Sequence, residues 1–448
     1  MSSDVQWFEK TLGEVTVNHD WKRRPVKESE RKKGPYPYYG ASGIVDCVDG
    51  YIFEGQHLLI AEDGENLQTR QTPIAFMADG KFWVNNHAHI VTGNGEVTIE
   101  YLNYFLQNAD VQSYLTGAVM PKLTQGNLNR IPVRYPALVY QKAIVRVLAS
   151  LDRKIDLNRR INQTLEAMAQ AIFKSWFVDF DPVKAKIAAL QEGRDPLRAA
   201  MSAISGKPDA DLAALPCEQY KQLAATAALF PDEMEASALG EIPRGWEAGS
   251  LSDFACFQNG YAFKAKDWTD LGHPVIKIGN VKPGIIGLSG CSFVAHETVN
   301  GLDRFSLKRG DLLVGMTGYV GETGLVPALD SVAYFNQRVG RISTANGMND
   351  IGYPFCLVRN PAYRAYAESK AHGSAQANVS GKDLMDYPLV VPGTGVLNIF
   401  NAQAAKIISA LLSYHEESQS LAALRDTILP KLLSGELSVT DSPAEAEV

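Results

Sequence analysis

Hydrophobic positions between residues 141 and 177 recur at alternating steps of four and three. This is a heptad seam, the pattern of a helix packed along a partner helix. Its members are Ile144, Leu148, Leu151, Ile155, Asn158, Asn162, Leu165, Ala169, Ile172 and Trp176. The sequence therefore predicts one long helix with a polar interruption near its middle.

The same pattern returns 256 residues later. The corresponding positions are Phe400, Ala404, Ile407, Leu411, Tyr414, Ser418, Leu421, Arg425, Ile428 and Leu432. The second interruption, Tyr414 and Ser418, lies where Asn158 and Asn162 lie in the first copy. Each seam also follows a segment with two prolines, which favours an extended approach to the helix. These prolines are Pro132 and Pro136 in the first copy and Pro388 and Pro392 in the second.

We interpret the chain as an internal duplication of the α+β class. Two globular domains with mixed β-sheets are spaced by two long helices, which pack as an antiparallel coiled coil with pseudo-two-fold symmetry. In that arrangement we expect Asn158 and Asn162 to meet Tyr414 and Ser418 and to fix the register, as a buried polar residue does in coiled coils. The predicted segments are residues 1–140 (domain 1), 141–177 (first helix), 178–243 (connector), 244–398 (domain 2), 399–436 (second helix) and 437–448 (disordered tail).

Local patterns predict several further elements. An apolar run at residues 57–61 is typical of a buried strand, and residues 74–84 suggest a hairpin with an Asp79-Gly80 turn. Residues 101–115 have a helical pattern. In the connector, which has no aromatic-rich core of its own, we expect short helices that pack on neighbours, or a partly mobile linker. Pro430 lies inside the second helix and should kink or thin its last turn.

Composition narrows the class of protein. A chain of 448 residues with 46% hydrophobic and 21% charged residues suits two or three domains of an ordinary soluble protein. The start lacks a secretion signal, so we expect a cytoplasmic protein without a membrane partner. The five cysteines are scattered, which indicates reduced thiols rather than disulfides or zinc ligands. The net charge of −7 argues weakly against non-specific nucleic-acid binding over the whole surface.

The sequence has no well-matched catalytic motif. The segment Ser380-Gly-Lys-Asp383 lacks the remaining residues of a phosphate-binding loop, and no methyltransferase motif of the Asn/Asp-Pro-Pro-aromatic type is present. His87 and His89 could form a metal pair, but such spacing more often places one histidine inside and one outside. We therefore expect no catalytic residue and no metal site.

Loops rich in amide, tyrosine and basic residues favour binding instead. Amide and guanidinium groups suit base edges, whereas lysine and backbone amides suit phosphates. The alternative is that these loops are ordinary surface turns. The candidate DNA contacts are Lys22, Arg23, Arg24, Tyr36, Tyr38, Asn66, Arg70, Lys122, Gln125, Asn127, Gln258, Asn259, Lys264, Lys266, Asn280, Lys282, Thr317, Tyr319, Asn336, Gln337 and Arg338.

Four motifs resemble the DNA-specificity subunit of type I restriction–modification systems, and the resemblance covers essentially the whole chain. They are Glu62-Asp-Gly-x-Asn66, Gly240-Glu-Ile-Pro-x-Gly-Trp246, Asn336-Gln-Arg-Val-Gly340 and Leu424-Arg-Asp-Thr-Ile-Leu-Pro-Lys-Leu-Leu-Ser-Gly-Glu-Leu437.

The resemblance implies a non-catalytic subunit with two target-recognition domains, each reading half of a bipartite site in double-stranded DNA. It also implies that the helices dock two methyltransferase subunits and, through the assembled complex, restriction or motor subunits. S-adenosylmethionine, ATP and Mg²⁺ would then belong to the partners, with no cofactor in this chain. Two alternatives remain: a coiled-coil protein–protein adaptor without DNA binding, and a nuclease that uses Glu62, Asp63 and Glu65.

Overall fold

The computed structural model describes residues 5–117, 120–373 and 377–439 and divides the chain into two compact units. Unit 1 comprises Met1–Ile155 and Ser420–Val448, and unit 2 comprises Asp156–Gln419. The division passes through both long helices, so each helix contributes one part to each unit. Of the predicted tail, residues 440–448 lie outside the described residues.

Unit 1 is built from two four-stranded sheets and a separate strand pair. Its elements are β1 (Trp7–Thr11), α1 (Leu12–Val15), β2 (Thr16–Asn18), β3 (Lys33–Gly40), β4 (Gly43–Val48), β5 (Phe53–Glu54), β6 (His57–Ala61), α2 (Asn66–Thr69), β7 (Ala75–Ala78), β8 (Lys81–Val84), β9 (Ala88–Gly93), α3 (Ile99–Asn108), α4 (Gln125–Asn129) and β10 (Pro132–Pro136). The sheets have the orders β2-β9-β6-β7 and β4-β3-β8-β5, and β10 pairs antiparallel with β1. The expected extended segment before the first helix is thus a strand.

The predicted hairpin over residues 74–84 is wrong. The two strands exist, but β7 pairs with β6 in one sheet, whereas β8 pairs with β5 and β3 in the other. Asp79 and Gly80 form the tight link between the sheets, with Gly80 at φ +75° and its amide donating to the Asp79 carboxylate. A turn signal fixes a change of direction but does not decide which strand becomes the partner.

Unit 2 repeats this plan around longer loops. Its elements are α6 (Asp181–Gln191), α7 (Pro196–Ser205), α8 (Asp209–Leu212), α9 (Cys217–Ala228), β11 (Met234–Ser237), β12 (Gly240–Pro243), β13 (Glu247–Ser250), β14 (Cys256–Asn259), β15 (Trp268–Thr269), β16 (His273–Ile276), β17 (Gly284–Ile285), β18 (Ser292–Val294), β19 (Leu312–Gly315), β20 (Thr323–Leu325), β21 (Tyr334–Phe335), β22 (Val339–Ser343), α10 (Gly352–Val358), α11 (Pro361–Lys370), α12 (Gly381–Met385) and β23 (Pro388–Val391). The main sheets have the orders β14-β22-β19-β20-β17 and β15-β18-β16-β21. Strand β23 pairs with β13, as β10 pairs with β1.

The short helices of the connector pack on one another around a small hydrophobic core without buried aromatic residues. Ala200, Met201, Leu212 and Ala227 are fully buried, and they bring α7, α8 and α9 together. The helix α7 begins with an Asp195 carboxylate that accepts hydrogen bonds from the backbone amides of Leu197 and Arg198, which is a stable N-cap. Alanine, methionine and leucine side chains supply this core.

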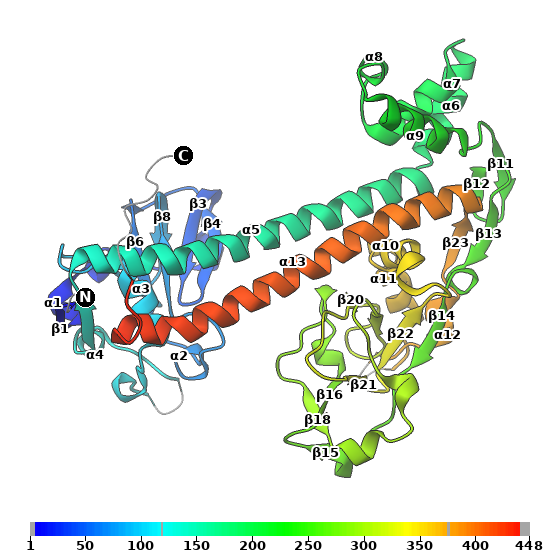
Figure 1. The fold of residues 1–448 in the computed structure, drawn as a ribbon. Coiled ribbons are helices and arrows are strands. Elements are labelled where there is room, and N and C mark those ends of the chain that lie inside the picture. Colours follow the sequence, from blue (N-terminus) through cyan, green and yellow to red (C-terminus); the bar gives the residue numbers. More distant parts are fainter. Residues whose placement is uncertain (1–4, 118–119, 374–376, 440–448) are drawn as a thin grey trace. The chain divides into compact units, whose positions relative to one another are not determined.

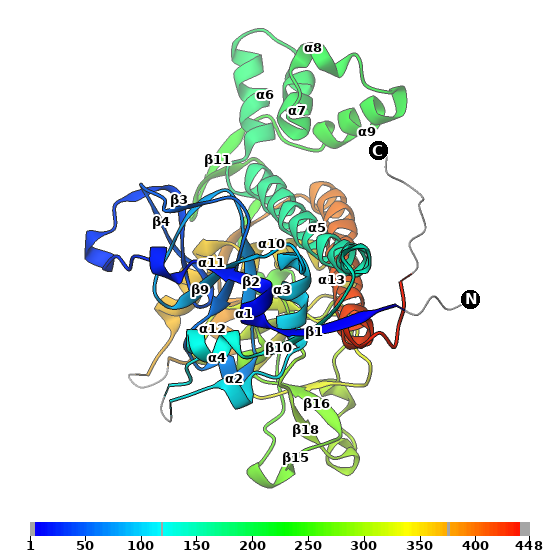
Figure 2. The ribbon, with the colours of Figure 1, turned by 90° about the vertical axis from the view of Figure 1, so that its left-hand side faces the viewer.

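The two long helices, α5 (Leu138–Phe177) and α13 (Thr394–Ser434), lie side by side in both views (Figure 1; Figure 2). In unit 1 Arg425 of α13 forms an ion pair with Asp152 of α5 at 2.7 Å. In unit 2 the Asn158 side chain donates to Glu417 at 2.8 Å, and Asn162 donates to the carbonyl of Leu411 at 3.1 Å. Rising numbers on one helix match falling numbers on the other, which confirms the predicted antiparallel pairing.

The polar register differs in detail from the prediction. The Asn158 amide does lie near Tyr414, at 3.5 Å from its carbonyl oxygen. Ser418, however, donates to the Tyr414 carbonyl of its own helix, and Asn162 instead faces Leu411. Helix α13 continues through Pro430 to Ser434 and is followed by Gly435 at φ +81°. That left-handed conformation favours glycine and suits a helix end.

Within the described residues, α13 is long and apolar enough to cross a membrane by length and composition alone. Its side chains Phe400, Ala404 and Ile408 belong to the core of unit 2, and Leu429 and Leu432 belong to that of unit 1. Packing inside the protein therefore accounts for the apolar character of these positions.

Candidate nucleic-acid interface

One edge of unit 1 brings three distant segments together. Strands β6 and β9 pair antiparallel with Ala61 opposite Ala88, so the residues after β6 meet the residues before β9. The Glu62 amide donates to the His87 carbonyl at 2.9 Å. A third segment joins them, because the Leu123 amide donates to the Glu62 carbonyl at 2.7 Å. We call this arrangement the three-segment edge of unit 1.

Unit 2 has an equivalent edge with the same backbone hydrogen bonds. The Met316 amide donates to the Arg338 carbonyl at 3.0 Å, and the Val379 amide donates to the Met316 carbonyl at 2.9 Å. These residues follow β19, precede β22 and begin the third segment, respectively. Strands β19 and β22 pair with Gly315 opposite Val339. This arrangement is the three-segment edge of unit 2.

Isolated bridges fix the correspondence residue by residue. Asp63 bridges to Lys122 in unit 1, and Thr317 bridges to Asn378 in unit 2. The offset is 254 residues for the first member of each bridge and 256 for the second. The amide of Gly64 donates to the Pro121 carbonyl, just as that of Gly318 donates to the Ala377 carbonyl. The two units therefore share one backbone frame at this edge.

The side chains on this frame differ between the units. In unit 1 the Asp63 carboxylate lies 2.7 Å from the His87 ring, and the Lys122 ammonium lies 3.1 Å from Glu62. In unit 2 the Thr317 hydroxyl donates to the Asn378 side-chain oxygen at 2.6 Å. A hollow of about 610 Å³ opens there. Its lining comprises Asn259, Gly260, Ala262, Met316, Thr317, Gln337, Arg338 and Asn378.

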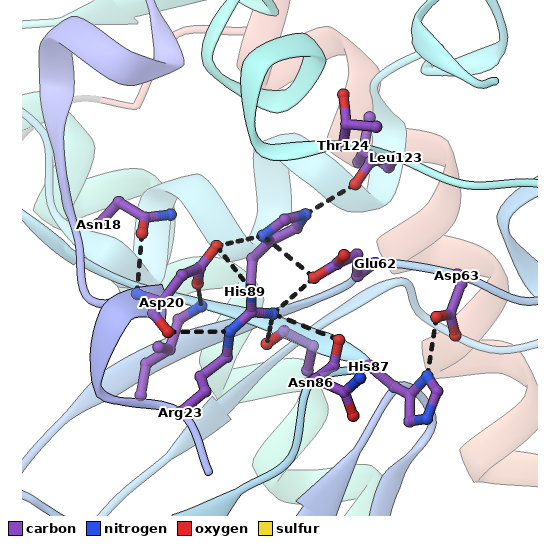
Figure 3. A network of polar contacts seen from close by, with 12 residues as sticks. Asn18, Asp20, Arg23, Glu62, Asp63, Asn86, His87, His89, Leu123 and Thr124 are labelled. Carbon is purple, nitrogen blue, oxygen red and sulfur yellow. Dashed lines mark hydrogen bonds and ion pairs between the residues drawn. The ribbon is translucent and has the colours of Figure 1, made fainter. Parts of the chain in front are cut away.

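A network of charged residues, Asp20, Arg23, Glu62 and His89, lies next to the three-segment edge of unit 1 (Figure 3). His89 is fully buried, with one ring nitrogen 2.6 Å from the Asp20 carboxylate and the other 2.7 Å from the Leu123 carbonyl. The Arg23 guanidinium lies 2.6 Å from Glu62 and 3.3 Å from Asp20, and it donates to the Ala88 carbonyl. The network thus connects all three segments to the turn at residues 20–23.

The charges of this network stabilise its carboxylates. Burial alone would raise the pKa of Asp20, but the hydrogen bond and charge of His89, the Ile90 amide and the charge of Arg23 together leave the pKa below its usual value. Burial likewise opposes ionisation of Glu62, and the hydrogen bond from Arg23 leads the contacts that lower its pKa. Both groups therefore stay ionised at neutral pH.

The Asp20, Glu62 and His89 side chains also satisfy the distance expected for a metal-binding cluster. Each ring nitrogen of His89, however, faces an oxygen that accepts a hydrogen bond, so neither offers a lone pair to a metal. Arg23 and Lys122 already lie against the carboxylates. The His87 ring points instead to Asp63. A shared metal site on His87 and His89 does not fit this geometry.

Several predicted DNA contacts have partners inside the protein. These are Arg23 in the charge network, Tyr38 at the Val26 amide, Asn66 at Thr72, Arg70 at the Leu106 and Ala109 carbonyls, Asn127 at the Tyr114 carbonyl, Gln258 at Arg341 and the Arg304 carbonyl, Asn280 at the Gly287 carbonyl, and Thr317 at Asn378. Such contacts are typical of residues that shape a loop. Their direct contact with DNA stays a prediction.

Other predicted residues have exposed side chains. They are Lys22, Arg24, Lys122, Gln125, Asn259, Lys264, Lys266, Lys282, Tyr319, Gln337 and Arg338, whereas Tyr36 and Asn336 are half-buried. Of the predicted set, Asn259, Thr317, Gln337 and Arg338 come together around the hollow of unit 2, and Arg23 and Lys122 meet at Glu62 in unit 1. Lys264, which precedes the short turn at Ala265–Asp267, and Lys266, which lies within it, do not line that hollow.

Four residues at or near these edges are absent from the predicted DNA contacts: Trp21 and Asn378, and also Asp63 and His87, which were considered only for a nuclease and a metal pair. Trp21 is 77% exposed, in the turn that Asp20 and Arg23 hold. Asn378 had a usable signal, because the 256-residue offset maps Lys122 onto it. His87 corresponds in the same way to Arg338, at an offset of 251. Applying the repeat to candidate residues, as well as to the helices, would have identified both.

Comparisons with known proteins agree with this duplicated architecture. The family model described as "Type I restriction modification DNA specificity domain" matches residues 4–167 and 243–423. The HindI specificity subunit of Haemophilus influenzae is 31% identical over 359 residues, which is 76% of each chain. The MjaIX specificity subunit of Methanocaldococcus jannaschii is 21% identical over 96% of this chain and 93% of its own.

The fold also resembles a solved structure. The crystal structure of the S subunit of a type I restriction–modification system from M. genitalium matches with a TM-score of 0.52 and 15% identity, over 96% of this chain and 97% of that one. At that identity the likeness concerns the fold. The family model, by contrast, covers well over half of the chain in two separate stretches. The chain therefore belongs to the family of type I restriction–modification DNA specificity subunits.

Proposed function

We propose that each unit reads one half of a bipartite site in double-stranded DNA. The observation that carries the proposal is the duplication itself. Each unit has the same strand pair, the same three-segment edge and a share of both long helices, within a family of DNA specificity subunits. A protein that carries the same binding frame twice is suited to a site with two parts.

The long helices would set the distance between the half-sites. Helix α5 has 40 residues, and a rise of ~1.5 Å per residue gives it a length of about 60 Å. At ~3.4 Å per base pair this length limits the separation to roughly 18 base pairs. Because α5 and α13 pair antiparallel, a change in the length of one helix would disturb the pairing with the other.

The chain would act without chemistry of its own. Glu62 and Asp63, the strongest candidates for a nuclease, face Arg23, Lys122 and His87. We propose that S-adenosylmethionine, ATP and Mg²⁺ bind partner subunits. Two methyltransferase subunits would dock on the paired helices, and restriction or motor subunits would join through the complex.

The net charge of the chain favours partners that supply most of the contacts to DNA phosphates. The chain has a net charge of −7, so its long-range field does not attract DNA. Non-specific affinity depends on cations that neutralise phosphates, and the partners would supply most of them. The isolated chain should therefore bind DNA weakly, and the complex should bind with a steep dependence on salt.

The test is a sequence selection with the assembled complex of this chain and its methyltransferase subunits. The complex is equilibrated with a random DNA library, and the bound fraction is sequenced. The proposal predicts a motif with two defined halves separated by a fixed run of undefined bases. A contiguous motif, or no enrichment by a correctly assembled complex, would contradict it. A chain that captures partner proteins equally well after nuclease treatment and retains no DNA would favour the adaptor function.

A further inference from the structure

We propose that side chains at corresponding positions of the two three-segment edges determine which bases each unit reads, and that the two units read different bases because these side chains differ. The positions are 63, 87 and 122 in unit 1 and 317, 338 and 378 in unit 2, with Gln337 and Asn259 completing the second set. This inference rests on the proposed function, because it names the residues that would give each half-site its sequence.

The two units have matching backbone hydrogen bonds at these edges. In each unit, an amide after the first strand is bonded to the carbonyl just before the antiparallel partner strand, and the third segment is bonded to the first. An isolated bridge adds a contact between the first and third segments in both units. Side chains at matching positions therefore project from matching places. Such a frame permits changes in recognition without changes in fold.

The side chains at these positions contrast in chemistry. Residues that only maintain the frame would be expected to keep their character in both copies, as Gly64 and Gly318 do. Instead, Asp63 is replaced by Thr317, His87 by Arg338 and Lys122 by Asn378. All six are polar, and those in the second and third positions are exposed in both units. Polarity is thus retained while hydrogen-bonding capacity changes.

Unit 2 mainly offers hydrogen-bond donors. The Arg338 guanidinium and the Gln337 amide are exposed beside the hollow. The Thr317 hydroxyl donates to the Asn378 oxygen, which directs the chemistry of Asn378 toward its amide nitrogen. Arginine matches the two acceptors on the major-groove edge of guanine, and glutamine matches the donor and acceptor of adenine. The geometry points to a purine-reading edge, with Arg338 assigned to guanine.

Unit 1 has a charged carboxylate, which only accepts hydrogen bonds when ionised, where unit 2 has the Thr317 hydroxyl. The Asp63 carboxylate follows β6 at the edge and contacts the His87 ring, whose side chain is 51% exposed. A carboxylate accepts a hydrogen bond from the amino group of cytosine, and it can thereby distinguish cytosine from thymine, which has an acceptor there. Lys122 is also exposed, although its ammonium lies 3.1 Å from Glu62. Asp63 is therefore assigned to a cytosine in the other half-site.

The experiment compares four complexes in the same random-library selection: the parent complex, Arg338→Ala, Asp63→Ala and the control Lys308→Ala. Lys308 is an exposed cation in the turn before β19, whereas Arg338 lies at the other end of that strand's pairing with β22. Thermal unfolding and complex size are measured for each, so that only folded, assembled complexes are compared. The parent complex must first yield a bipartite motif, and its failure to do so would count against the proposed function itself.

Arg338→Ala should relax one guanine position in one half-site and leave the other half unchanged. A bidentate contact supplies about 5- to 150-fold discrimination, so preference at that position should fall by this factor. Asp63→Ala should relax one position in the opposite half-site, and Lys308→Ala should leave the motif unchanged. An unchanged motif in Arg338→Ala and Asp63→Ala would overturn the assignment. Equal weakening at every position would also overturn it, because a phosphate contact acts in that uniform way.

Discussion

Replacing Asn158 and Asn162, the polar residues in the middle of the helix pair, with leucine should stabilise the protein. Asn158 is fully buried and Asn162 is partly exposed, and each donates through its side-chain nitrogen to α13. Among the described residues, neither side-chain oxygen has a hydrogen-bond partner. A buried acceptor without a partner costs about 1–3 kcal/mol. Replacing both asparagines with leucine removes two such acceptors from the seam.

The magnitude follows from what is gained and lost. Asn162→Leu sacrifices one hydrogen bond to the Leu411 carbonyl, about 1 kcal/mol, and gains apolar burial of about 1–2 kcal/mol. Asn158→Leu also loses the stronger bond to the Glu417 carboxylate, so this single change should be nearly neutral. The double variant should be more stable by about 2 kcal/mol. For a unit of this size the shift in Tm is about 4–8 °C.

Differential scanning calorimetry of the full chain measures this shift, with Gln163→Leu as the control. Gln163 is exposed on the same helix, so its replacement should change stability by less than about 0.5 kcal/mol. If the asparagines fix the register, the stabilised variant should also tolerate other registers. The complex would then select half-sites at more than one spacing. A lower Tm in the double variant, with unchanged spacing, would refute this reasoning.

Three other predictions concern ion pairs and salt. The pKa values of Asp20 and Glu62 are lowered on folding from 3.8 and 4.5, so the stability that their ionised forms contribute is complete above about pH 4.5 and is lost as pH falls. Glu62→Gln should therefore make Tm fall less steeply between about pH 6 and pH 3. Arg425→Ala removes the ion-pair partner of Asp152, which keeps its hydrogen bond from Tyr104, and should destabilise unit 1 by about 1–3 kcal/mol, measured by urea unfolding, whereas the exposed Asp426→Ala should have little effect. Specific binding by the complex should weaken with added salt along a straight log–log line, measured by fluorescence anisotropy, and a flat line would contradict reliance on phosphate contacts.

The pairing of the two long helices could be predicted because it follows from the heptad periodicity of the sequence. The heptad and its copy fixed α5, α13 and their antiparallel pairing without knowledge of any contact. Strand partnership could not be predicted in the same way, since an apolar run such as β7 is compatible with either sheet. Small residues such as Ala200 and Ala227 concealed the connector core, because size and aromaticity were the signals sought.

For the site, the sequence predicted which loops are rich in polar and basic residues, but not which of those residues face solvent. Residue chemistry selected Arg338 and Gln337, which line the hollow of unit 2, and in the same way selected Arg70 and Asn280, which shape their own loops. An arginine that terminates a helix and an arginine that faces solvent look the same in a sequence. The decisive information was the three-dimensional correspondence of Asp63 with Thr317 and of Lys122 with Asn378.

The most direct test of the two-reader account is a domain exchange. Residues 1–140 are replaced by the equivalent domain of a related specificity subunit, and the bases methylated by the assembled complex are mapped across a genome. The account predicts that one half of the bipartite motif changes while the other half and the use of two halves persist. Simultaneous change of both halves, or retention of the original motif by the assembled chimera, would contradict it.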